Sequence, residues 1–207
     1  TSPERVLALC EAVTHIERHN IAGDIVECGV WRGGSTAAAA RTLTNLNSAD
    51  RKLWMYDTFS GMCEPTAVDT DFMGADASEL LDQNDRSNQT SVWCVSELNE
   101  VKQTMASTGY PSDKLVYVEG KVEETLLTTI PQAISLLRLD TDWYESTRCE
   151  MEVLFPRLVP GGILIVDDYG HWNGCRKAID EYFSNHGISM YLNRIDYTGR
   201  LGIKLEK

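Results

Sequence analysis

The sequence predicts a mostly parallel, doubly wound α/β fold that forms one domain over residues 1–207. Short apolar runs of strand length alternate along the chain with segments of helical periodicity, and nearly every apolar run ends on an acidic residue. With 43% hydrophobic and 24% charged residues, the 207 residues have an ordinary globular composition and suffice for one sizeable core. The sequence contains no internal repeat, low-complexity tract or linker.

The predicted elements begin with a helix within residues 1–22, because Ser2 and Pro3 are typical of an N-cap followed by a first-turn proline. Strands are predicted at 25–29, 53–57, 115–118, 134–140 and 163–168. Helices are predicted at 35–43, at 76–81, from 96 onward, at 145–158 and at 175–183. Two last strands, 188–195 and 201–205, are joined by a turn long enough only for an antiparallel hairpin.

Residues 60–95 carry no sustained periodicity apart from the short predicted helix. Connections of this length in compact domains are usually lids or binding loops, so we expect a lid or substrate segment here. Its apolar side chains, suited to a bulky ligand, include Met62, Met73, Leu80 and Trp93.

The composition disfavours several classes of partner. A formal net charge of −12 repels a phosphate backbone, so we expect no nucleic-acid partner. No stretch approaches the ~18–20 apolar residues of a membrane span, and no signal peptide is visible. The six cysteines show no C-x-x-C spacing, which argues against a zinc site or a redox pair. We therefore expect a cytoplasmic protein that acts on a small molecule.

The turn after the first strand is glycine-rich but lacks the dinucleotide pattern G-x-G-x-x-G. Glu27 stands where the first glycine of that pattern would be, and its charge repels a pyrophosphate but suits a cationic methionine group. Gly29 allows close backbone approach, and Asp57 is placed to accept hydrogen bonds from a ribose diol. The alternative is an ordinary strand-turn-helix connection. The candidate cofactor-binding residues are Glu27, Cys28, Gly29, Ser35, Asp57 and Gly120.

Four acids stand at the ends of two strands. Asp140 and Asp142 follow the fourth strand, and Asp167 and Asp168 end the fifth. If these strands are neighbours, their ends lie ~5 Å apart, and Asp140, Asp167 and Asp168 can share one cation. An all-oxygen site suits Mg²⁺, Mn²⁺ or Ca²⁺. The alternative is that the acids cap the following helices, where carboxylates are favoured.

A family resemblance rests on four segments, which are residues 26–34, 56–62, 137–144 and 162–169. They resemble the macrocin O-methyltransferase family of the TylF/MycF/NovP type, whose members methylate sugar hydroxyls of macrolide and aminocoumarin antibiotics and related glycosides. The resemblance covers essentially the whole chain. It implies a seven-stranded Rossmann-like methyltransferase sheet, S-adenosylmethionine and Mg²⁺.

The resemblance also implies roles for single residues. Carried over by motif, Asp140, Asp167 and Asp168 are the metal ligands and Asp142 is the general base. Family members often have a further N-terminal segment that helps cover the site, whereas little precedes Gly23 here.

The expected activity is therefore that of a divalent-metal-dependent O-methyltransferase of class 2.1.1, acting on a hydroxyl of a sugar or glycosylated small molecule. Three alternatives remain: a glycosyltransferase that uses the D-x-D triplet 140–142, a catechol-type O-methyltransferase, and a non-catalytic S-adenosylmethionine-binding protein. A homodimer is expected. Further candidates for substrate contact are Tyr169 and His171, and the tryptophans that adjoin the proposed site are Trp31, Trp143 and Trp172.

Overall fold

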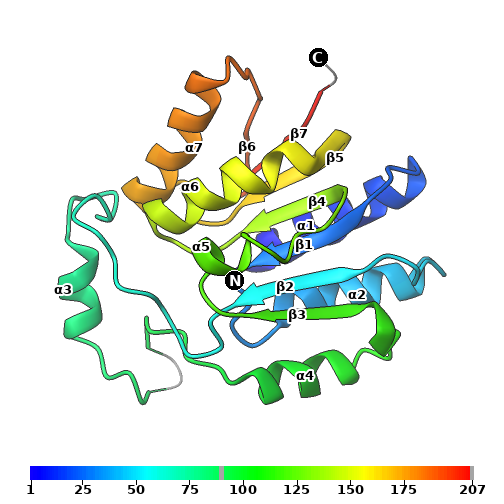
Figure 1. Cartoon of the computed structure of the whole chain (residues 1–207), viewed down its shortest axis with the longest axis horizontal. Coiled ribbons are helices and arrows are strands. Elements are labelled where there is room, and N and C mark those ends of the chain that lie inside the picture. The colour runs from blue at the N-terminus through cyan, green and yellow to red at the C-terminus, as the bar shows by residue number, and fades with distance from the viewer. Residues whose placement is uncertain (89–90, 206–207) are drawn as a thin grey trace.

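The computed structural model describes residues 1–88 and 91–205, which are built around one seven-stranded sheet. The parallel strands are β1 (Asp24–Cys28), β2 (Leu53–Asp57), β3 (Leu115–Glu119), β4 (Ile134–Leu139) and β5 (Leu158–Val166). β7 (Arg200–Ile203) pairs antiparallel with β5, and β6 (Asn193–Arg194) pairs antiparallel with β7. The strand order β3-β2-β1-β4-β5-β7-β6 confirms the predicted fold class (Figure 1).

Helices cover both faces of the sheet (Figure 1). One face carries α1 (Pro3–Arg18), α2 (Gly34–Asn45) and α4 (Leu98–Ala106), and the other carries α5 (Val122–Thr125), α6 (Tyr144–Val153) and α7 (Asn173–Asn185). Because side chains alternate along a strand, β1 directs Val26 and Cys28 into the core with α6 and Ile25 into the core with α1. The sheet therefore separates two apolar cores.

Proline and glycine decide where α6 ends and β5 begins. The helix predicted at 145–158 ends at Val153, because Pro156 lacks an amide hydrogen and cannot continue it; a short 3₁₀ turn, Phe155–Arg157, follows. β5 begins at Leu158 and runs through Gly161 and Gly162, where a break was predicted. Its register with β4 shifts between Ile134 and Leu136, so the sheet absorbs the glycines as an irregularity.

The strand predicted at 188–195 is also shorter than expected. β6 pairs only over Asn193 and Arg194. The Ile188 amide donates to the Phe183 carbonyl oxygen at 2.8 Å, which closes the end of α7, and Met190 packs against the core. The apolar run 188–192 therefore covers the core beside α7 instead of extending the sheet.

The sheet register brings the ends of its central strands to one edge. Cys28 lies opposite Tyr56 and Leu139, and Leu139 lies opposite Val166, so the residues that follow these strands meet. Residues 58–88 and 91–97, which include α3 (Ala77–Asp82), cross this edge. They are fastened to α6, because the buried Asp69 carboxylate accepts a hydrogen bond from the Tyr144 amide at 2.7 Å.

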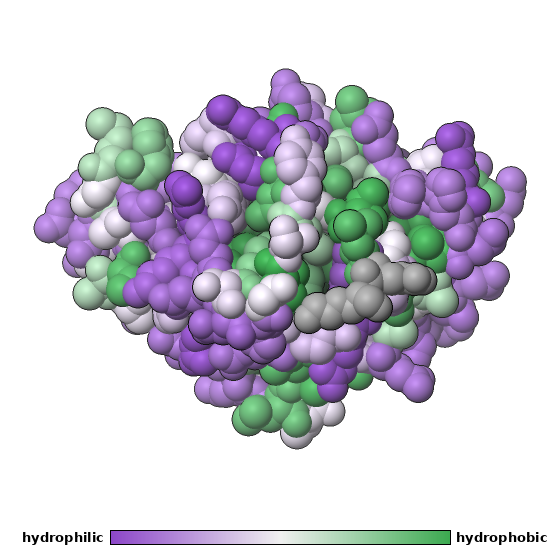
Figure 2. All heavy atoms as spheres, turned by 90° about the horizontal axis from the view of Figure 1, so that it is seen from above, coloured by the Kyte–Doolittle hydropathy of each residue, from purple (hydrophilic) through white to green (hydrophobic). Residues whose placement is uncertain are grey.

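Hydrophilic side chains cover most of the surface seen from above in Figure 2, with apolar side chains between them. No helix in the described parts of the chain is long and apolar enough to span a membrane.

Candidate active site

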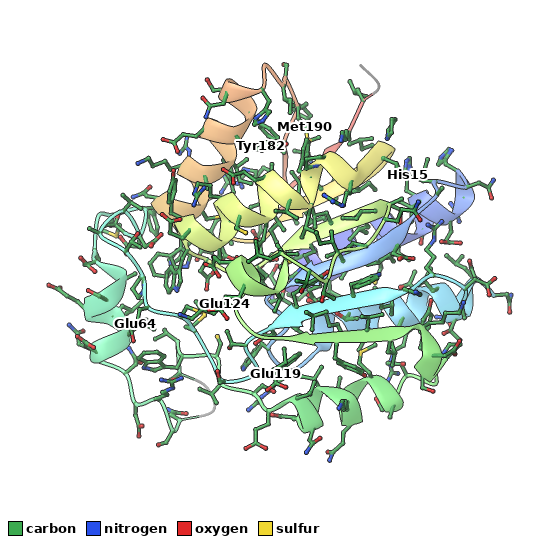
Figure 3. The ribbon with its side chains drawn as sticks, in the orientation of Figure 1. His15, Glu64, Glu119, Glu124, Tyr182 and Met190 are labelled. Atoms are coloured by element: carbon green, nitrogen blue, oxygen red, sulfur yellow. The ribbon has the colours of Figure 1, made fainter. Side chains whose placement is uncertain are left out.

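A cavity of about 370 Å³ opens at the carboxyl edge of the sheet. Figure 3 shows Glu119 and Glu124 near this edge, whereas His15 lies toward the opposite end of the molecule. One wall is formed by residues that follow the strands, and another by residues within 58–81 and 92–94. The residues of the first wall that the sequence nominated are Gly29, Asp57, Gly120, Asp140, Asp142, Asp167 and Asp168.

Asp57 holds the turn that follows β1. Its Oδ2 atom accepts hydrogen bonds from the amides of Val30 and Trp31 at 2.7 and 2.9 Å, and its Oδ1 atom accepts from the Phe59 amide at 2.7 Å. Gly29 has φ +81°, and a Cβ atom there would overlap the Asp140 carbonyl oxygen. Glycine therefore allows the turn after β1 to pack directly against the residue that follows β4.

Glu27, Cys28 and Ser35 do not line this cavity. The Glu27 carboxylate was expected to face a cofactor, but it is buried, where it pairs with Arg138 Nη1 at 2.6 Å and accepts a hydrogen bond from Thr36. Cys28 is buried in the core with α6. The physical reason is strand alternation: side chains within β1 point to the faces of the sheet, and only residues beyond its end reach the edge.

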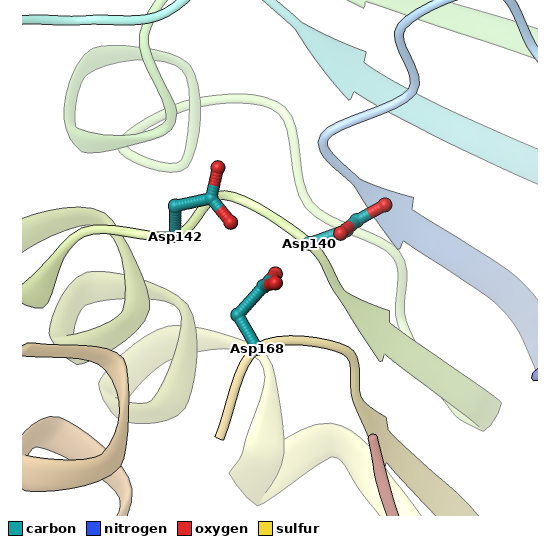
Figure 4. A group of neighbouring side chains, drawn as sticks. All are labelled: Asp140, Asp142 and Asp168. Atoms are coloured by element: carbon teal, nitrogen blue, oxygen red, sulfur yellow. The ribbon is translucent and has the colours of Figure 1, made fainter. Parts of the chain in front are cut away.

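Three carboxylates converge in the cavity (Figure 4). One oxygen atom each of Asp140, Asp142 and Asp168 lies within 4.8 Å of the other two. Asp140 and Asp142 come from the turn after β4, and Asp168 follows β5 (Figure 4). The Oδ2 atom of Asp168 is buried and has no hydrogen-bond partner among the described residues. This donor set has the all-oxygen character that a hard divalent cation prefers.

The same convergence perturbs the acids. Burial raises the pKa of Asp142 to about 7, and the Asp140 charge adds to the rise. Burial also raises the pKa values of Asp140 and Asp168 well above their ordinary range; Asp142 raises that of Asp168 further. Arg138, which pairs with Asp140 at 2.7 Å, offsets only part of this effect, so a further positive charge in the group would favour the ionised carboxylates.

Asp167 stands apart from this group. Its Oδ1 atom accepts from Arg138 Nη2 at 2.6 Å, and its Oδ2 atom pairs with Arg5 of α1. The side chains of Asp167 and Arg138 are each only 4% exposed. The sequence nominated Asp167 beside Asp140 and Asp168, but the structure brings Asp142 into that position. Guanidinium groups hold both oxygen atoms of Asp167, whereas only Oδ2 of Asp140 pairs with Arg138.

Tyr169 and His171, the further candidates for substrate contact, lie outside the cavity lining. The Tyr169 hydroxyl donates to Asp180 Oδ1 at 2.6 Å on α7. The His171 ring packs beside Phe72 and Tyr197, with centroid distances of 5.8 and 5.9 Å. Tyr169 thus contacts α7, whereas His171 lies against Phe72 and the turn that holds Tyr197.

The apolar part of the cavity is well developed. The tryptophans expected near the site, Trp31, Trp143 and Trp172, all line it. From the segment expected to act as a lid, Met62 and Leu80 also line it, whereas Met73 is 81% exposed to solvent. Trp93 does not line it. Its indole Nε1 donates to the Leu81 carbonyl oxygen, so the Trp93 side chain packs against α3 of the same segment.

Sequence analysis did not identify two arginine side chains of the site, those of Arg138 and Arg5. Arg138 pairs with Glu27, Asp140 and Asp167, and a single arginine within the apolar run 134–139 was a usable signal, because a buried guanidinium requires acidic partners. Arg5 lines the cavity from the first turns of α1 and also pairs with Asp196 at 2.9 Å. An arginine near the start of a helix carries no comparable signal.

Comparison with known proteins gives concordant matches. The family model described as Macrocin-O-methyltransferase (TylF) matches residues 1–201. The 8-demethyl-8-(2,3-dimethoxy-alpha-L-rhamnosyl)-tetracenomycin-C 4'-O-methyltransferase of Streptomyces olivaceus is 35% identical over 179 residues, which cover 86% of this chain and 65% of that protein. This chain therefore spans less than two thirds of that relative's length.

Two further matches cover more of the known protein. The mycinamicin III 3''-O-methyltransferase of Micromonospora griseorubida is 33% identical over 196 residues, which cover 95% of this chain and 74% of that protein. The solved structure of the O-methyltransferase NovP matches with a TM-score of 0.83 at 27% identity, covering 98% of this chain and 80% of that one.

Proposed function

Because the chain belongs to the macrocin O-methyltransferase family, we propose that it transfers a methyl group from S-adenosylmethionine to a sugar hydroxyl of a glycosylated small molecule. One observation carries this proposal. The convergent carboxylates of Asp140, Asp142 and Asp168 share a cavity with Gly29 and Asp57, the turn expected to bind the cofactor. A methyl donor and an acceptor hydroxyl must meet in one such space.

The cofactor end of the proposed site is formed by Gly29, Asp57 and Gly120. Both glycines have positive φ, of +81° and +133°, so the backbone approaches the cavity without an intervening side chain. The Asp57 oxygen atoms accept backbone hydrogen bonds, but a carboxylate has about four lone-pair sites, which leaves capacity for a ribose hydroxyl.

For the acceptor end, we propose that Asp140 and Asp168 are ligands of a divalent cation and that Asp142 lies against it. The buried, unpartnered Oδ2 atom of Asp168 fits this role, because a buried carboxylate oxygen needs a donor or a cation. A divalent cation there would supply the positive charge that lowers the pKa of an acceptor hydroxyl. Asp142 would accept the hydroxyl proton, because one of its carboxylate oxygen atoms lies within 4.8 Å of the Asp140 and Asp168 oxygen atoms.

The apolar wall supports a bulky acceptor. Trp31, Met62, Leu80, Trp143 and Trp172 would contact the aglycone, while the sugar reaches the carboxylates. The names of these relatives describe methyl transfer to glycosylated acceptors, a rhamnosyl tetracenomycin and mycinamicin III. These names support a glycoside over a free small alcohol.

Calorimetry tests the proposed cofactor against the glycosyltransferase alternative. S-adenosylhomocysteine is expected to bind the purified chain, and UDP-sugars are not, because the Asp57 carboxylate at the cofactor end of the cavity disfavours a pyrophosphate. Binding of a UDP-sugar without binding of S-adenosylhomocysteine would reject the proposal. Binding of S-adenosylhomocysteine with no methyl transfer to any offered acceptor would favour a non-catalytic binding protein.

A further inference from the structure

Glu150 is a buried acid that the proposed chemistry does not use. It lies in the middle of α6, is 0% exposed and is absent from the cavity lining. The Thr141 hydroxyl donates to its carboxyl group, with oxygen-oxygen distances of 3.0 and 3.1 Å to Oε1 and Oε2. Thr141 stands between Asp140 and Asp142, so Glu150 contacts the acid-bearing turn from the core side.

The same carboxyl group also reaches β1. The Cys28 thiol lies close enough to Glu150 that the Glu150 charge, after burial, raises the pKa of the thiol, and the Cys28 carbonyl oxygen accepts from the Asp140 amide at 2.8 Å. Glu150 therefore contacts both the strand that precedes the Gly29 turn and the turn that follows β4.

The acid-bearing turn needs such a support. Asp142 has φ +68°, a left-handed conformation that residues other than glycine adopt at a cost and keep only where their surroundings fix it. The Trp143 amide donates to the Thr141 carbonyl oxygen at 2.8 Å, which tightens the turn but does not attach it to the core. Among the described contacts of the Thr141 side chain, the hydrogen bond to Glu150 makes that attachment.

We propose that Glu150 is a positioning residue that holds Asp140 and Asp142 at their spacing from Asp168 by binding the Thr141 hydroxyl. Its effect on methyl transfer rests on the proposed function, but its effect on the turn does not. Burial raises the pKa of Glu150 well above its ordinary value, so a neutral glutamine is the conservative replacement.

The test compares five variants with the wild type, of which the first four are Glu150→Leu, Thr141→Val, the double variant, and Glu150→Gln as the conservative control. Glu152→Gln is the matched surface control, because Glu152 lies on the same helix and pairs only with Arg148 in the described structure. Two quantities are measured below the melting temperature of every variant. They are amide hydrogen exchange in the peptide that covers residues 140–143, and Mn²⁺ affinity by electron paramagnetic resonance.

Glu150→Leu and Thr141→Val are each expected to speed exchange in the turn and weaken Mn²⁺ binding by about tenfold or more, a size typical for the loss of a group that orients a metal ligand. The double variant should be no worse than either single variant, because both remove the same hydrogen bond. Glu150→Gln and Glu152→Gln should stay within about threefold of the wild type.

Unchanged exchange and Mn²⁺ affinity in Glu150→Leu or Thr141→Val would overturn the positioning role, as would additive losses in the double variant. If Glu150→Leu does not fold, Thr141→Val decides the question alone. If the wild type binds no Mn²⁺, the proposed function fails at its metal site, and the exchange rates still decide whether Glu150 holds the turn.

Discussion

Arg138 Nη2 donates to Asp167 Oδ1 at 2.6 Å, and both side chains are almost completely buried. Asp168, the next residue, has a buried Oδ2 atom without a hydrogen-bond partner in the described structure. Two consecutive aspartates therefore have opposite environments, because one already has cationic partners and the other lacks them. This difference separates the residue that stabilises the fold from the residue proposed to bind a cation.

Replacing each of these two aspartates by alanine should give opposite results. Asp167→Ala is expected to lower the free energy of unfolding by about 3 kcal/mol or more, because it leaves Arg138 buried with one partner fewer. Asp168→Ala should leave the free energy of unfolding unchanged or higher, while Mn²⁺ affinity falls about tenfold or more. Denaturant titration and Mn²⁺ binding measure the two effects. Loss of Mn²⁺ binding in Asp167→Ala with unchanged stability would restore Asp167 as a ligand.

A pair of glycine variants tests the close approach of β1 and β4. Gly29→Ala should destabilise the chain by about 2 kcal/mol or more, because the left-handed backbone is strained and the new Cβ overlaps the Asp140 carbonyl oxygen. Gly34→Ala is the control, since nothing lies within 4 Å of its Cβ position, and a change of at most about 1 kcal/mol toward stability is expected. Equal melting temperatures for both variants would contradict the packing described here.

Asp142→Asn should lower the rate of methyl transfer by about 10²–10⁴-fold, the usual contribution of a general base. The affinity for S-adenosylhomocysteine should not change, because the proposed cofactor contacts belong to other strands. Glu64→Gln is the control, since Glu64 also lines the cavity but lies outside the carboxylate group. A variant that loses Mn²⁺ affinity and regains its rate at high Mn²⁺ would identify Asp142 as a ligand and not the base.

S-adenosylhomocysteine should bind without added metal, because Gly29, Asp57 and Gly120 are separate from the carboxylate group. A thermal-shift titration in EDTA is expected to show stabilisation of the wild type and none for Asp57→Ala, in which the turn loses three backbone hydrogen bonds. No shift for the wild type in EDTA would show that the two sites are one.

The sheet could be predicted from the sequence because its strands are short apolar runs that end at acidic residues or glycine-containing turns. The family resemblance rested on motifs at strand ends, and the family model confirms it over residues 1–201. The predicted element boundaries were wrong where the same residue type occurs in two kinds of structure. Gly161 and Gly162 were interpreted as a break but lie within β5, and the apolar run 188–192 was interpreted as a strand but packs beside α7.

The site was harder to predict than the fold, because sequence order does not say which way a side chain points. Asp140, Asp142, Asp167 and Asp168 all reach the cavity, as their positions after β4 and β5 predicted. The pairing of Asp167 with Arg5 depends on a helix more than 160 residues away in sequence, so no local sequence pattern could predict it. Glu27 precedes the end of β1 by one residue, and that offset is enough to bury it.

Methyl transfer to defined acceptors tests the central claim most directly. The purified chain is given S-adenosylmethionine and Mg²⁺ with a panel of rhamnosyl and other deoxysugar glycosides and with simple catechols, and products are followed by mass spectrometry with and without EDTA. The account predicts a mass gain of one methyl group on a glycoside, located on the sugar by fragmentation and lost in EDTA. Turnover of catechols with none on any glycoside, or glycoside turnover that EDTA leaves unchanged, would contradict it.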